Sequence, residues 1–137
     1  PYYYTPVSDA GLTRWYMALH EALGERKIEI YFYNFPQMTG ISIPVKVIEN
    51  LANQAPLRFT GIKDSSGDLD FCRSIVIANS ALRVFPSSET ALKNAYTDRF
   101  AGCISALLRS ASVSLFCLFS SSFCAGPWDL STPICTK

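Results

Sequence analysis

The 137-residue sequence has little charge and no cluster of basic residues. Charged residues make up 17% of the chain, and 12 Lys and Arg residues against 11 Asp and Glu residues give a net charge of +1. The basic residues are scattered singly, so no patch or tail is suited to the backbone of a nucleic acid. Because 49% of the residues are hydrophobic, the composition is that of a globular chain and not of a disordered one. We therefore predict one domain of ordinary size with no nucleic-acid partner.

Paired cysteine motifs and a leader segment are also missing. The five cysteines include no C-x-x-C pair, and an odd number argues against a complete disulfide framework. Buried or incidental thiols in a reducing compartment are the favoured interpretation, which predicts a cytoplasmic protein. The chain begins with Pro1, and no charged segment followed by an apolar one opens it. We expect a processed or truncated start.

Helical and strand-like segments alternate along the first three quarters of the chain. Residues spaced as on a helical face follow Ser8, Pro44, Asp68 and Ser88, and β-branched or aromatic runs lie between them. This order predicts a parallel sheet covered by helices, either doubly wound or part of an eight-stranded barrel. No Gly-x-Gly-x-x-Gly follows any strand, which disfavours dinucleotide binding. The expected strands are residues 27–33, 59–63, 82–85 and 100–106.

The character of the sequence changes after Ala106. Residues 110–128 carry no charge and are rich in serine and cysteine. A membrane span needs about 20 predominantly apolar residues, and the serines make this segment a poor one, so we expect no membrane partner. A buried final helix and a tail unrelated to the fold both remain open. We divide the chain into a domain of residues 1–106 and a tail of residues 107–137.

The stretch GIKDSSGD, residues 61–68, places Lys63 at the end of an apolar strand. Active sites of parallel α/β folds lie at the carboxyl ends of the strands. There an unprotonated lysine can condense with a ketone to form a Schiff base, and a tyrosine such as Tyr33 can carry the proton that the reaction moves. The structural alternative is a solvated lysine, or one paired with Asp64, beside a Tyr33 that belongs to the core or rim. The spacing alone favours this alternative.

Four motifs together resemble one enzyme family. PYYYTP at 1–6, YNFPQMTG at 33–40, GIKDSSGD at 61–68 and GCIS at 102–105 occur in the order and spacing of the dihydrodipicolinate synthase/N-acetylneuraminate lyase family of Schiff-base aldolases. The resemblance covers Pro1 to about Ala106. It implies a TIM (β/α)₈ barrel, of which this chain supplies about the second half, with a tail that is foreign to the family.

The resemblance also implies roles for single residues. Lys63 would form the Schiff base with pyruvate or another 2-oxo acid, and Tyr33 would donate and accept the proton. Tyr3 would complete the proton relay, in many members by reaching into a neighbouring subunit. The backbone of Ile104 would line the pyruvate site, and the hydroxyl of Ser65 would lie near the substrate. No metal or organic cofactor is implied, and the full-length parent is expected to be a homo-oligomer.

Two departures from the family pattern limit what is carried over. The first half of the barrel, with the Gly-rich Thr-Thr segment that holds the pyruvate carboxylate, does not occur in these 137 residues. Met38 stands where the synthase has arginine, and methionine cannot make a bidentate contact with a carboxylate. An aldolase for a sugar-derived 2-oxo acid is therefore favoured. The alternatives are 4-hydroxy-tetrahydrodipicolinate synthase and a non-catalytic truncated fragment, and the fragment alone is expected to be inactive.

Overall fold

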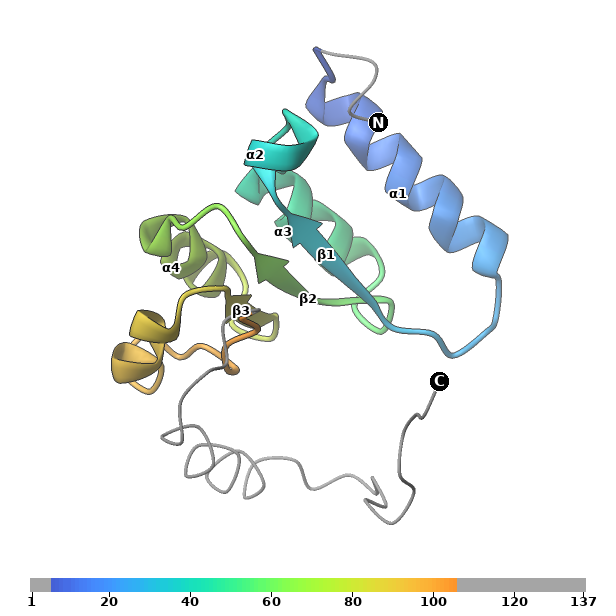
Figure 1. Ribbon diagram of the computed structural model, residues 1–137. Helices are drawn as coiled ribbons and strands as arrows, with labels where there is room; N and C mark the ends of the chain where they lie inside the picture. Colours follow the sequence, from blue (N-terminus) through green and yellow to red (C-terminus); the bar gives the residue numbers. More distant parts are fainter. Residues whose placement is uncertain (1–5, 106–137) are drawn as a thin grey trace, which may run out of the picture. The chain divides into compact units, whose positions relative to one another are not determined.

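The computed structural model describes residues 6–105, which form a three-stranded parallel sheet with helices packed on it (Figure 1). The predicted tail of residues 107–137 and Tyr3 lie outside the described residues. Among residues 6–105, no helix has the length and apolar character needed to cross a membrane. In chain order the elements are α1 (Asp9–Leu23), β1 (Ile30–Asn34), α2 (Pro36–Thr39), α3 (Val45–Gln54), β2 (Phe59–Asp64), α4 (Leu69–Ala78), β3 (Arg83–Pro86) and the 3₁₀ helix η1 (Glu89–Asn94).

The residues that precede the helices determine where they begin. The Ser8 hydroxyl accepts a hydrogen bond from the backbone N–H of Gly11 at 3.1 Å, and α1 ends at Gly24 in a positive-φ conformation (φ 55°). Pro44 precedes α3, and the Asp68 carboxylate accepts two backbone N–H groups in the first turn of α4. These starts confirm the helices expected from the sequence.

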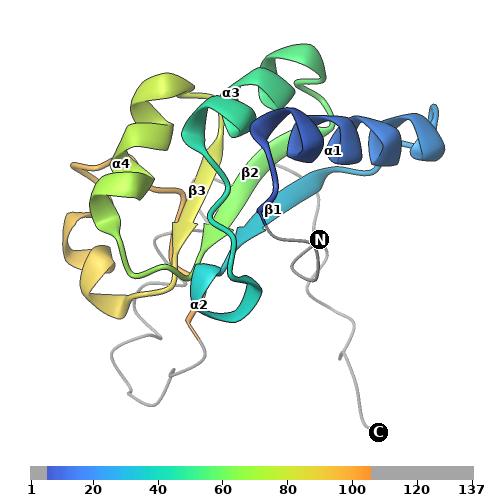
Figure 2. The same ribbon diagram turned by 90° about the horizontal axis from the view of Figure 1, so that it is seen from above.

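The sheet order follows the chain order, with β2 between β1 and β3 and all strands parallel. Tyr33 on β1 lies opposite Lys63 on β2, so both are at the carboxyl end of the sheet, as predicted. Helices α1, α3 and α4 cover the same face of the sheet (Figure 2). Sequential strands with helices on one side are typical of a (β/α) barrel, whereas a doubly wound sheet is covered on both faces.

Alternation along the strands separates two faces of different character. Phe32, Ile62 and Val84 are paired across the three strands and are almost completely buried on the helix side. Tyr31 and Tyr33 point to the opposite face and are 38% and 49% exposed. The core therefore lies between the sheet and the helices, and the tyrosine-bearing face is the other one.

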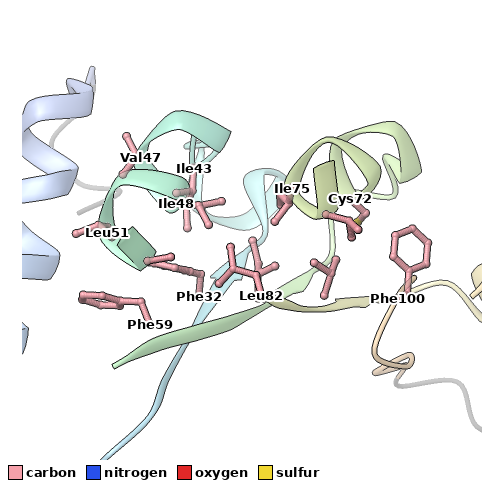
Figure 3. Close-up of a cluster of buried hydrophobic side chains, with 14 of the residues drawn as sticks. Phe32, Ile43, Val47, Ile48, Leu51, Phe59, Cys72, Ile75, Leu82 and Phe100 are labelled. Carbon is pink, nitrogen blue, oxygen red and sulfur yellow. The ribbon is translucent and has the colours of Figure 1, made fainter. Parts of the chain in front are cut away.

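Helices α3 and α4 contribute most of the helical side of this core. Their apolar positions recur at helical spacing and turn toward the sheet, where those of α3 lie over the rings of Phe32 and Phe59 (Figure 3). The rings of Phe32 and Phe59 are stacked with centroids 5.4 Å apart. The buried residues of the two helices are Val47, Ile48, Leu51, Ala52, Cys72, Ile75 and Val76.

The predicted fourth strand, residues 100–106, is not formed as a regular strand in the described part of the chain, which includes its first six residues. Ala101 donates its backbone N–H to the carbonyl of Val84 at 2.9 Å, and Ile104 donates to Pro86 at 3.0 Å. These donors are three residues apart while their acceptors are two apart, so one extra residue interrupts the parallel ladder. The segment lies beside β3, as expected, but the predicted regular strand is not formed.

The first strand is also shorter than predicted, because β1 begins at Ile30 and not at residue 27. The buried Arg58 side chain donates to the carbonyls of Gly24, Arg26 and Ile28 at 2.6–2.7 Å. The Arg58 guanidinium, which has five N–H donors, thus forms hydrogen bonds with the carbonyl groups that precede the strand. The segment is held by a side chain instead of by ladder hydrogen bonds.

Candidate active site

Lys63 and Tyr33 lie side by side on the face of the sheet that the helices do not cover. The Lys63 Nζ atom is 4.0 Å from the centroid of the Tyr33 ring and 3.2 Å from the Ser65 Oγ atom. β1 positions the phenol, while β2 and the turn after it position the amine and the hydroxyl. The structure therefore brings together three of the predicted site residues around one nitrogen atom.

This arrangement changes the acidity of the tyrosine. The pKa of the Tyr33 phenol is lowered, first because Lys63 is a hydrogen-bond donor beside it and then because Ser65 is another. A nearby cation and nearby donors favour the ionised form of a phenol. Tyr33 is consequently better prepared than an ordinary tyrosine to exchange a proton with a group bound at Lys63.

Asp64 is not the ion-pair partner of Lys63. Its side chain points to the opposite, helix-covered face and is only 1% exposed. It accepts hydrogen bonds from Asn34 Nδ2 at 2.7 Å, from the backbone N–H of Ser66 at 3.1 Å and from Ser66 Oγ at 2.7 Å. The ion-pair alternative for Lys63 is thereby excluded, since successive strand residues face opposite sides.

Asn34 and Asp64 form a buried polar pair next to the candidate site that the sequence alone did not reveal. Asn34 is 1% exposed, and its Oδ1 atom accepts the backbone N–H of Ile43 at 3.0 Å. A polar residue directly after Tyr33 and another directly after Lys63 were visible in the sequence. Recognising them as buried partners would have required the strand alternation and the pairing of β1 with β2.

The other predicted residues take different positions. Ile104 donates its backbone N–H to Pro86 at the carboxyl end of β3 and is 45% exposed, so it shares the end of the sheet where Lys63 lies. Met38 lies on α2, directly after β1, and is 70% exposed. Tyr3 lies outside the described residues.

The described part of the site is open to solvent above Tyr33 and Lys63. A cavity of about 230 Å³ lies instead at the amino ends of β2 and β3, where Thr60 and Arg83 are among its lining residues. Within residues 6–105, no group of three or more His, Cys, Asp and Glu side chains is placed to hold a metal ion. Small-molecule sites are usually concave. Enclosing a ligand at Lys63 would therefore take further groups from outside the described residues.

Comparison with known protein sequences identifies one family. The profile of the Dihydrodipicolinate synthetase family matches residues 1–121. An "Uncharacterized DapA-like lyase" of Chloroflexus aurantiacus is 31% identical over 107 residues, which are 78% of this chain and 36% of that protein. The chain spans about a third of the length of the curated relatives it matches. The family match extends past Ala106, where the resemblance of the motifs ends.

Solved structures of the same family resemble the described fold. Dihydrodipicolinate synthase from Agrobacterium tumefaciens has a TM-score of 0.71 and 30% identity, covering 77% of this chain and 37% of that one. A variant of Sulfolobus solfataricus 2-keto-3-deoxygluconate aldolase in complex with pyruvate has a TM-score of 0.63 and 25% identity, covering 77% and 33%. These matches confirm that the α/β architecture is part of a TIM barrel. The placement in the second half and the domain division at residue 106 stay predictions.

Proposed function

Because the chain belongs to the dihydrodipicolinate synthetase family, we propose that it is part of a class I aldolase or lyase acting on a 2-oxo acid. The observation that carries the proposal is the placement of the Lys63 amine at the carboxyl end of β2, over the Tyr33 ring and beside the Ser65 hydroxyl. Members of this family include lyases and aldolases. The chain supplies the amine and phenol that such chemistry needs.

The proposed reaction begins with the unprotonated Lys63 amine attacking the ketone carbon of pyruvate or a related 2-oxo acid. Loss of one water molecule leaves an imine between the Lys63 nitrogen and that carbon. Once protonated, the imine accepts the electron pair of the adjacent carbon–carbon bond when that bond breaks, and returns it when a bond forms. Tyr33 moves the accompanying proton, and the neighbouring Lys63 and Ser65 lower the pKa of its phenol.

The remaining predicted residues fit supporting roles in this proposal. Ser65 holds the amine at 3.2 Å and would lie next to the carbonyl carbon of a bound 2-oxo acid. Ile104 would present its backbone to the substrate from the neighbouring segment, and Tyr3 would extend the proton relay from Tyr33. The protein containing these residues would act as a homo-oligomer, with no metal or organic cofactor.

Met38 favours a sugar-derived 2-oxo acid as substrate. It is 70% exposed on the short helix α2, next to the carboxyl end of β1, where an arginine could bind a second carboxylate. A thioether offers no such contact. The second candidate is 4-hydroxy-tetrahydrodipicolinate synthase, which the likeness to the Agrobacterium synthase supports.

The chemistry is tested by reductive trapping. A protein carrying these residues within a complete barrel is incubated with pyruvate and borohydride, and modified lysines are mapped by mass spectrometry. We expect the adduct on Lys63 and its loss in Lys63→Met, with Lys46→Met on α3 as the matched control. Tyr33→Phe should still be trapped but should turn over about 10²–10⁴-fold more slowly. An adduct on other lysines, or none at all, would exclude the proposal.

The same assay on the 137-residue chain alone distinguishes the non-catalytic alternative. The Tyr33 side chain beside Lys63 is 49% exposed in the described residues, so water reaches the surroundings of the Lys63 amine. We expect weak trapping or none. Efficient, saturable trapping would show that this chain is sufficient. Comparing cleavage of 2-keto-3-deoxygluconate with condensation of pyruvate and a carboxylate-bearing aldehyde then separates the aldolase from the synthase.

A further inference from the structure

Each of the two proposed catalytic residues is followed directly by a buried polar residue. Tyr33 precedes Asn34 on β1, and Lys63 precedes Asp64 on β2. The strands are paired so that Tyr33 lies opposite Lys63 and Asn34 lies opposite Asp64. The alternation of strand side chains therefore places one pair on the open face and the other pair on the helix-covered face.

Each side-chain nitrogen and oxygen atom of the buried pair makes a hydrogen bond, and the pair connects four segments of the chain. Asn34 Nδ2 donates to Asp64 Oδ1 at 2.7 Å, and Asn34 Oδ1 accepts from the backbone of Ile43, just before α3. Asp64 Oδ2 accepts from the Ser66 N–H and hydroxyl, and Ser66 Oγ in turn accepts the N–H of Asp68 at the start of α4. In the residues described, no buried side-chain nitrogen or oxygen atom lacks a partner.

The surroundings of Asp64 show how isolated it is from solvent. Burial first, and then the adjacent Asp64 carboxyl, raise the pKa of the Cys72 thiol on α4 to about 12. A carboxyl in such a place is costly unless its hydrogen bonds are kept. The backbone N–H of Ser65 also donates to the carbonyl of Asn34 at 2.8 Å, so the turn after β2 is tied to β1.

We propose that Asn34 and Asp64, here called the polar clamp, are positioning residues that hold Lys63 over Tyr33 from the opposite face of the sheet. A slip of β2 by one residue against β1 would turn Lys63 to the face of the sheet opposite Tyr33. The clamp opposes that slip and fixes the turn that carries Ser65. The functional importance of the clamp rests on the proposed roles of Tyr33 and Lys63, whereas its geometry does not depend on them.

The hydrogen-bond pattern offers a sharp test, because the two residues can be exchanged. In Asp64→Asn an amide nitrogen must replace one acceptor oxygen, so either the Asn34 contact or the Ser66 contacts are lost. In Asn34→Asp two carboxyl groups face each other. In the double variant Asn34→Asp/Asp64→Asn, the carboxylate introduced on β1 accepts from Ile43 and from the amide introduced on β2, while the carbonyl of that amide accepts from Ser66. Every contact of the clamp is therefore restored.

The readout is the titration of the Tyr33 phenol, followed by NMR with ring-labelled tyrosine and assigned with Tyr33→Phe. Lys63 is the charged group that faces this ring in the described residues. We expect the pKa of Tyr33 to rise toward the ordinary tyrosine value in each folded single variant and to return to the wild-type value in the double variant. Asp70→Asn, which removes an exposed carboxylate in the first turn of α4, should leave it unchanged.

The outcomes separate a positioning role from a purely structural one. A purely structural role would lower the thermal midpoint of the single variants and leave the Tyr33 titration of the folded protein unaltered, which would overturn the proposal. If the single variants do not fold, the double variant decides: wild-type titration supports the clamp, and an unfolded or altered double variant refutes it. The titration needs no substrate. Failure of pyruvate trapping in a complete barrel that carries these residues would therefore refute the proposed function while leaving the clamp intact.

Discussion

Replacing Gly61 with alanine tests how closely the strands approach beneath the site. Gly61 lies on β2, two residues before Lys63 and on the same face, opposite Tyr31 and Arg83 in the neighbouring strands. A Cβ atom at this position would lie 2.5 Å from the carbonyl oxygen of Arg83 and 2.5 Å from Cε1 of the Tyr31 ring. Both distances are far below van der Waals contact, so one neighbour or the strand itself must move.

Two opposing effects determine the magnitude. Alanine reduces the conformational freedom of the unfolded chain, and this alone would stabilise a strand by about 0.5–1 kcal/mol relative to glycine. Overpacking of a well-packed site costs about 1–3 kcal/mol. The Tyr31 ring can turn away, but the Arg83 carbonyl belongs to the backbone of β3, which is paired with β2 at Gly61. The clash therefore outweighs the entropic gain, and we expect a net loss of about 1–2 kcal/mol.

Urea unfolding followed by far-UV circular dichroism measures the change. Gly61→Ala should lower the midpoint with little change in the slope. The matched background is Tyr31→Ala, which removes the ring but not the carbonyl clash. In that background the cost of Gly61→Ala should shrink but not vanish. A Gly61→Ala protein as stable as the wild type, or more stable, would refute the close approach of β2 and β3 at this point.

Three further predictions concern Cys72, Arg58 and Tyr33. The pKa of the Cys72 thiol is raised to about 12 in the folded chain, above the unfolded-state value of about 8.5. The stability that the protonated Cys72 thiol contributes is therefore complete below about pH 8.5 and is lost as the pH rises toward 12. Between about pH 7.5 and about pH 10 the wild type should lose more unfolding free energy than Cys72→Ala, and equal losses would contradict the assignment. Arg58→Met leaves three carbonyls without their donor and should cost at least about 2 kcal/mol in urea unfolding, with Arg58→Lys in between. Lys63→Met should raise the pKa of Tyr33 in NMR titrations, because its first hydrogen-bonding partner is removed; an unchanged titration would show that the amine does not act on the phenol.

Most of the secondary structure could be predicted from the sequence, because its signals are local. Apolar spacing identifies the buried faces of α3 and α4, and helices begin after Ser8 and Asp68 as predicted. The apolar run at residues 59–62 was enough to place β2 and to put Lys63 at its end. The identities of Lys63 and Tyr33 as site residues came from motifs, not from periodicity.

The partners of these residues depend on long-range contacts, which no local pattern encodes. Asn34 and Asp64 are 30 residues apart, and their pairing depends on the register of β1 against β2. Arg58 shortens β1 through hydrogen bonds to carbonyls about 30 residues earlier in the chain. The segment after residue 100 has the composition of a strand but is paired irregularly with β3. Propensity describes what a segment can form, whereas long-range packing and hydrogen bonding select which face is buried and which donors remain for the site.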